Sequence, residues 1–131
     1  MPLPLDVIIA RWVSILWLLG GLSHLLYPAK WAAFLMPLRE RETSSFLLAA
    51  FNLPMGLMVV LAHNVWVWDL PVMVTVAGWL ATIKGVIYLL WPRSFTLMTS
   101  KITQPERGFR IVGIVAIVLG AVSGYDAFLR R

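Results

Sequence analysis

The residues best placed to do chemistry are a lysine and an asparagine inside apolar segments. Lys84 lies seven residues before Trp91, which places it about 10 Å inside the end of an apolar helix at 1.5 Å per residue. Asn52 lies eight residues into another apolar run, at a similar depth of about 12 Å. An intramembrane charge is costly and often functional, so Lys84 and Asn52 are candidates for a polar site or a pore constriction. The favoured interpretation is that the Lys84 side chain extends its ammonium group to the lipid headgroups.

A second pair of charged residues, Arg11 and Asp126, stands in the outer parts of the first and last apolar segments. Partly buried charges need partners, so the sequence predicts an ion pair that fixes these two helices together. Asp126 could instead carry a proton, but no second acid is placed to complete a relay.

The remaining reactive residues do not assemble into a catalytic set. His24 and His63 are predicted near opposite faces of the membrane, which disfavours haem ligation or a shared metal ion. Cysteine is absent, and neither a G-x-S-x-G elbow nor a phosphate-binding glycine loop occurs. We therefore predict a non-enzymatic protein with no catalytic residues, no metal site and no cofactor.

Four apolar segments must position these residues. They cover about 6–27, 44–63, 70–91 and 109–129, and about twenty residues are needed to cross a bilayer core. The chain is 60% hydrophobic and 13% charged, whereas about a quarter of residues are charged in soluble domains. The predicted fold is all-α: one integral membrane four-helix bundle over residues 1–131, with its first helix retained.

Basic residues fall mainly in two of the three connectors. Segments 28–43 and 92–108 contain six of them, and segment 64–69 contains none. By the positive-inside rule, both basic loops are predicted to be cytoplasmic, with the two termini outside. Arg11, Arg130 and Arg131 argue weakly against this orientation. Residues 30–36 and 93–98 are predicted to form short interfacial helices, or alternatively structured loops packed beneath the bundle.

The chain also contains an internal similarity. Residues 21–28 and 85–92 both read G-x-x-x-L-L-aromatic-P, 64 positions apart, and Gly56 and Gly120 match at the same offset. This predicts a tandem repeat of two-helix hairpins, with halves 6–63 and 70–129, related by an axis along the membrane normal. Chance similarity between two leucine-rich hairpins is the alternative.

Segments 85–95 and 104–113 resemble a family of two-helix bacterial inner-membrane proteins of unknown function. The shared features are a glycine, the helix-ending Pro92, a basic-aromatic piece, and an arginine plus glycine that open the next helix. Segments 63–69 and 78–85 are similar to another group of small four-helix bacterial membrane proteins. The first half departs from the pattern, with Ser45-Phe46 in place of Phe109-Arg110. The resemblance implies a duplicated hairpin in a bacterial inner membrane and assigns no functional residue.

Small residues recur at spacing four in two of the predicted helices, which favours close helix contact within one bundle or between protomers. These residues are Ala116, Gly120 and Gly124 in one helix, and Ala77, Ala81 and Gly85 in the other.

The predicted function is therefore action through helix contacts, as an oligomer or as an accessory or assembly subunit. The predicted partners are membrane lipid and a second copy or another membrane protein, with no nucleic acid. Two alternatives stay open. One is a small transporter or channel that uses Lys84 and Asn52. The other is a protein that binds a lipid or a quinone between its halves.

Overall fold

The computed structural model describes residues 2–131, of which 81% are helical and none lies in a strand. The all-α prediction is therefore confirmed. In chain order the elements are α1 (Leu5–Leu26), α2 (Pro28–Arg39), α3 (Ser44–Ala62), α4 (Pro71–Leu90), α5 (Ser94–Thr99), α6 (Pro105–Tyr125) and a π-helical turn, η1 (Asp126–Arg130).

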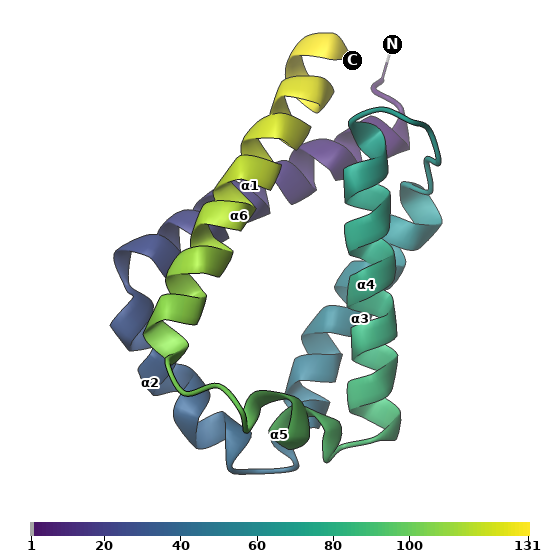
Figure 1. Ribbon diagram of the computed structural model, residues 1–131. Helices are drawn as coiled ribbons and strands as arrows, with labels where there is room; N and C mark the ends of the chain where they lie inside the picture. Colours follow the sequence, from purple (N-terminus) through teal and green to yellow (C-terminus); the bar gives the residue numbers. More distant parts are fainter. Residues whose placement is uncertain (1) are drawn as a thin grey trace.

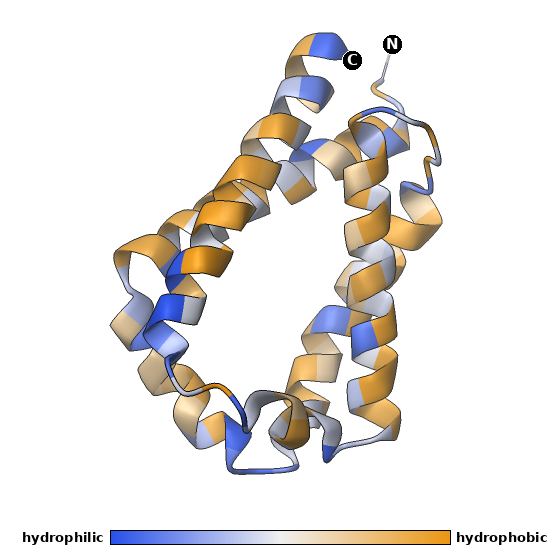
Figure 2. Ribbon diagram, viewed as in Figure 1, coloured by the Kyte–Doolittle hydropathy of each residue, from blue (hydrophilic) through white to orange (hydrophobic). Residues whose placement is uncertain are grey.

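Four helices are long and apolar enough to cross a membrane: α1, α3, α4, and α6 extended by η1. Figure 2 shows hydrophobic residues along their lengths and hydrophilic residues mainly near their ends and in the connectors. The first three follow the predicted ranges closely, but the fourth begins at Pro105 rather than near residue 109. Proline suits the first turn of a helix, and the polar first turn lies outside the apolar run from which the prediction was made.

The long helices associate as two pairs, α1 with α6 and α3 with α4, and contacts between the pairs are few. The pairs meet near the end that carries both termini and diverge toward the end that carries α2 and α5 (Figure 1). The four long helices are thus arranged as two closely packed pairs with limited contact between the pairs. A shared core exists only near the termini, where Ile9, Ala10, Val13, Val59, Val74 and Ala127 cluster.

Glycine allows each pair to pack closely. A Cβ atom added to Gly21 of α1 would lie 2.7 Å from the carbonyl oxygen of Gly113 and 2.9 Å from the amide nitrogen of Ile117, both in α6. A Cβ atom added to Gly85 of α4 would lie 2.7 Å from the amide nitrogen of Leu53 in α3. Gly21 and Gly85 are 64 positions apart, and so are Leu53 and Ile117. The two pairs thus touch at equivalent positions.

A second contact in each helix pair shows the same offset of 64 positions. A Cβ atom on Gly120 would lie 2.9 Å from the amide nitrogen of Leu18, and one on Gly56 would collide with the backbone of Thr82. Gly56 and Gly120, like Leu18 and Thr82, differ by 64 positions. The contact pattern is the one that a two-fold exchange of residues 6–63 with 70–129 would produce.

The aromatic contacts beside the connectors follow the same offset. The His24 and Trp31 rings stack at 4.4 Å, and the equivalent Tyr88 and Phe95 rings meet edge to face at 5.7 Å. Both amphipathic connector segments are helical, as α2 and α5, and both pack on the long helices. Arg39 of α2 donates from Nη1 to the carbonyl of Ile102 at 2.9 Å, so the two connectors are joined.

Candidate functional site

The site with the best-defined shape is a cavity of about 120 Å³ between α1 and the α3/α4 pair. We call it the apical cavity because it lies toward the end where the two pairs meet. Its lining consists of Trp12, Val13, Leu16, Trp17, Met55, Gly56, Val59, Val74, Ala77, Gly78 and Ala81.

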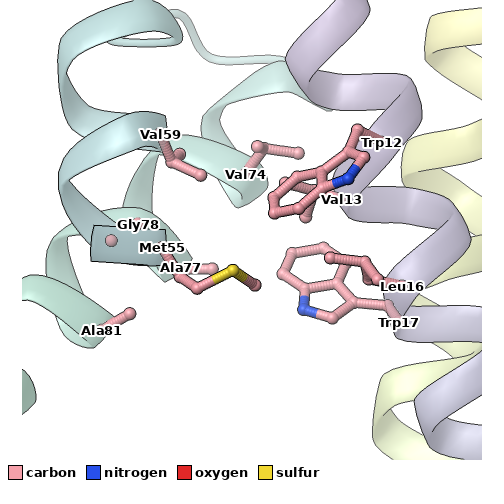
Figure 3. Close-up of a pocket in the computed structure, with 11 residues that line it drawn as sticks. Trp12, Val13, Leu16, Trp17, Met55, Val59, Val74, Ala77, Gly78 and Ala81 are labelled. Atoms are coloured by element: carbon pink, nitrogen blue, oxygen red, sulfur yellow. The ribbon is translucent and has the colours of Figure 1, made fainter. Parts of the chain in front are cut away.

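Large and small side chains face each other across this cavity. Trp12 and Trp17 project from α1 toward the opposite pair, and the Met55 side chain of α3 reaches toward Trp17 (Figure 3). On α4 the wall is formed by Ala77 and Ala81, whose short side chains leave room. Positions four apart share one face of a helix, so the small residues of α4 open the space that the indole rings of α1 border.

The lining contains no ionisable side chain, so the apical cavity presents an apolar surface. Apolar cavities of about 150 Å³ stay dry and bind molecules as small as benzene. Indole rings and thioethers also provide broad, polarisable contact surfaces. The cavity therefore suits the end of an apolar chain or a small ring.

The structure does not join the predicted pair Lys84 and Asn52. The Asn52 amide donates to the carbonyl of Leu48 in its own helix at 2.8 Å. The Lys84 ammonium lies 5.6 Å from the centroid of the Tyr88 ring, one turn nearer the basic connectors. No hydrogen bond or ion pair links Lys84 to Asn52 within residues 2–131. The direction of the Lys84 side chain fits extension toward the headgroups.

The predicted ion pair between Arg11 and Asp126 is replaced by other contacts. Asp126 is buried, and its carboxylate oxygens lie 3.2 Å from Nη1 of Arg130 and 2.9 Å from Nε of Arg131. Both contacts are ion pairs, and Oδ2 of Asp126 has no hydrogen-bond partner in the described residues. The wider π-helical turn ends with the amide of Arg131 bonded to the carbonyl of Asp126 at 3.1 Å, which brings both arginines back to this carboxylate.

Arg11 still joins the first and last of the four long helices, as predicted, but by different chemistry. Its Nε donates to the carbonyl of Ala127 at 2.8 Å, and its guanidinium lies 4.7 Å from the centroid of the Phe128 ring. Because Asp126 already has two arginine partners, its carboxylate does not need Arg11.

Further ion pairs neutralise the end that carries the termini. Arg130 binds both carboxylate oxygens of Asp69, at 3.0 and 2.7 Å, and holds the pKa of Asp69 at about 2. Arg131 also lies 3.1 Å from Asp6. The positive charge of Arg130 and Arg131, which weakened the predicted orientation, is thus balanced by neighbouring carboxylates.

His63, which was predicted near this face, is fully buried. Its Nδ1 lies 3.2 Å from Oγ1 of Thr75, and its Nε2 has no hydrogen-bond partner in the described residues. Burial lowers the pKa of the imidazole, so His63 is neutral. The same Thr75 hydroxyl contacts the backbone of Val65 and thereby fixes the loop between α3 and α4.

His24 lies in the connector half of α1, as predicted. Its Nδ1 is 2.6 Å from the carbonyl of Gly20, and its ring is stacked between Trp31 at 4.4 Å and Phe109 at 5.2 Å. No group of three His, Asp or Glu side chains that could hold a metal gathers anywhere in residues 2–131.

The small residues at spacing four in α6, which form one stripe along the helix, pack against α1 of the same chain. A Cβ atom on Gly124 would lie 3.5 Å from Oγ of Ser14, and Ala116 lies 3.0 Å from the Cβ position of Gly21. Together with Gly120, these residues form the contact with α1, so this stripe is not available to a second protomer.

The stripe of α4 divides between two neighbours. Gly85 packs on Leu53 of α3, and Ala81 approaches Gly56 of the same helix, while Ala77 and Ala81 line the apical cavity. The prediction missed Gly78, which has no room for a Cβ atom beside Val59. Gly78 follows directly after Ala77, so it does not belong to the series of small residues at every fourth position, and the prediction did not include it.

Comparison of the chain with protein-family models, with curated proteins and with solved structures gives no match. The resemblance of segments 85–95 and 104–113 to two-helix inner-membrane proteins stays a prediction.

Proposed function

We propose that this chain is a non-enzymatic multipass protein of a bacterial inner membrane that holds an apolar chain, such as a lipid tail or the isoprenoid tail of a quinone, between its two helix pairs. The observation that carries the proposal is the apical cavity, whose lining is apolar and comes from both halves of the chain. A tail that enters the cavity would continue between the diverging pairs, where bilayer hydrocarbon surrounds it.

The chain is proposed to be a tandem duplication of a helical hairpin. Support comes from the contacts at offset 64, Gly21 with Ile117 and Gly85 with Leu53. These contacts relate α1/α6 to α4/α3, so each pair combines one helix from each half. The proposed orientation has both basic connectors in the cytoplasm and both termini outside. It is supported by the ion pairs that offset the terminal arginines, since unpaired basic charge is then concentrated at the connectors.

The test of ligand binding uses a substitution that fills the cavity. Ala81→Leu adds three carbon atoms to the cavity wall, whereas Ala50→Leu adds the same atoms at an exposed position of α3. The full-length proteins are extracted in mild detergent, and the retained lipids and quinones are measured by native mass spectrometry. Wild type and Ala50→Leu are expected to retain one apolar ligand that Ala81→Leu loses. Equal retention by all three proteins would overturn the proposal.

A second candidate is the predicted role as an oligomer or as an accessory subunit. The observation in its favour is that apolar side chains between the two helix pairs remain exposed within the chain. Leu16 is 37% exposed and Met55 is 40% exposed. A helix from a second copy or another membrane protein could cover them. Chemical crosslinking of the full-length protein in native membranes tests this candidate, which predicts a discrete adduct. A protein that stays monomeric and uncrosslinked in its own membrane would exclude this role.

A further inference from the structure

A second concave site lies between α2 and the start of α6, with a volume of about 620 Å³. We call it the basic groove. Ala29, Ala32, Ala33 and Met36 of α2 form one side, and Arg107 and Arg110 of α6 belong to the other.

The two arginines of the basic groove have no partner within the chain. Arg107 and Arg110 are exposed and make no ion pair or side-chain hydrogen bond in the part of the chain that the structure describes. They are three positions apart, so they share one face of α6. Glu106 also lines the groove, which leaves one net positive charge. Guanidinium groups match the geometry of phosphate oxygens.

The other half of the chain lacks this arrangement. At the positions 64 residues earlier, Thr43 and Phe46 stand in place of Arg107 and Arg110. The residue equivalent to Ala29 is Arg93, whose Nε lies 3.6 Å from Glu42. The basic groove is therefore a feature of one half, and the shared architecture alone does not produce it.

The position of the basic groove favours one kind of anion. It lies where the polar first turn of α6 leads into an apolar span, which corresponds to the headgroup level of an inserted helix. Basic clusters beside membrane-spanning helices attract anionic lipids. The alanine and methionine side of the groove adds an apolar surface that a free phosphate ion would leave uncovered.

We propose that the basic groove binds an anionic phospholipid, with Arg107 and Arg110 contacting its phosphate and the α2 side contacting its glycerol and upper acyl chain. This site goes beyond the proposed function, because it uses other residues than the apical cavity and lies at the connector end of α6.

The test measures lipid selectivity of the full-length protein. Wild type and variants are purified in neutral detergent, supplied with equal amounts of phosphatidylglycerol and phosphatidylcholine, and examined by native mass spectrometry. The groove variant is Arg107→Gln/Arg110→Gln. The matched control, Arg41→Gln/Lys101→Gln, removes the same charge from exposed connector residues outside the groove.

The ratio of bound phosphatidylglycerol to phosphatidylcholine is expected to fall at least about tenfold in the groove variant, since loss of one hydrogen bond to a charged group weakens binding by about tenfold or more. The control is expected to change it less than about threefold, the part due to diffuse surface charge. Equal losses in both variants, or no preference for phosphatidylglycerol in wild type, would overturn the proposal. Competition by inorganic phosphate alone at equal concentration would show a free-anion site and would also overturn it. The cavity variant Ala81→Leu is expected to keep its lipid preference, so the two proposals fail separately.

Discussion

Replacement of Gly21 by alanine tests the closest contact between α1 and α6. The new Cβ atom would lie 2.7 Å from the carbonyl oxygen of Gly113 and 2.9 Å from the amide nitrogen of Ile117. Both neighbours are backbone atoms of a helix, so neither can move without displacing α6. Overpacking of this kind costs about 1–3 kcal/mol, although alanine itself favours a helix by about 1 kcal/mol over glycine.

The adjacent Gly20 provides the control, because a Cβ atom there would have no neighbour within 4 Å. Both variants gain the same helix propensity, so the difference between their free energies of unfolding isolates the helix contact. We expect Gly21→Ala to be less stable than Gly20→Ala by about 1–3 kcal/mol. Reversible unfolding in mixed detergent micelles, followed by circular dichroism, measures this difference.

The equivalent contact in the other pair extends this prediction. A Cβ atom on Gly85 would lie 2.7 Å from the amide nitrogen of Leu53, so Gly85→Ala is expected to lose as much stability as Gly21→Ala. If Gly21→Ala proves as stable as Gly20→Ala, the close packing of α1 on α6 is refuted. If only Gly85→Ala is tolerated, the equivalence of the two pairs is refuted instead.

Three further predictions concern ionisable groups and topology. Burial lowers the pKa of His63 below 6.5. As the pH decreases from about 7 to 5, the His63 imidazole therefore takes up a proton more readily in the unfolded state than in the folded state, and the free energy of unfolding should fall. The variant His63→Gln should lack this pH dependence in denaturation measurements. Acid destabilisation below about pH 4 should persist in that variant. The Asp69 carboxylate takes up a proton near pH 4 in the unfolded state, whereas in the folded state its pKa is about 2, so stability is lost as the pH falls from about 4 to about 2. Lys84→Met should leave solute flux into proteoliposomes unchanged, because the Lys84 ammonium lies over Tyr88 and is not joined to Asn52; a selective loss of flux would support the transporter alternative. Since the chain has no cysteine, variants with one introduced cysteine can show on which side of the membrane a loop lies. Trp68→Cys should react with an impermeant thiol reagent added outside the cytoplasmic membrane, and Ser100→Cys should react only after lysis.

The number and extent of the long helices could be predicted because each depends on local sequence. A continuous apolar run identifies each long helix, and prolines such as Pro71 mark first turns. The choice of neighbours could not be predicted. Helices that are apolar on every side carry little information about which side meets a partner, and the pairing of α1 with α6 joins segments from opposite ends of the chain.

The polar residues show a similar limit. Sequence correctly singled out Asp126 as a residue that needs a cationic partner, but a π-helical turn brings Arg130 and Arg131 to it. Such a turn leaves no clear pattern in the sequence. The burial of His63 was also missed, because it depends on the loop that Thr75 fixes through contacts ten and twelve positions apart.

Residues 64 positions apart can be compared at the helix crossings and in the cavity wall. Gly21 and Gly85 match and lie at the crossings, where both pairs need the same close approach. Gly56 and Gly120 also match, and Gly56 lines the apical cavity as well. Other residues of the cavity wall differ. Trp17 and Ala81 are 64 positions apart, and both line the apical cavity. Tryptophan at both positions would fill the cavity, and alanine at both would enlarge it. The combination of a large ring at position 17 with a small side chain at position 81 therefore determines the size of the cavity. Two identical residues at these positions could not form this arrangement.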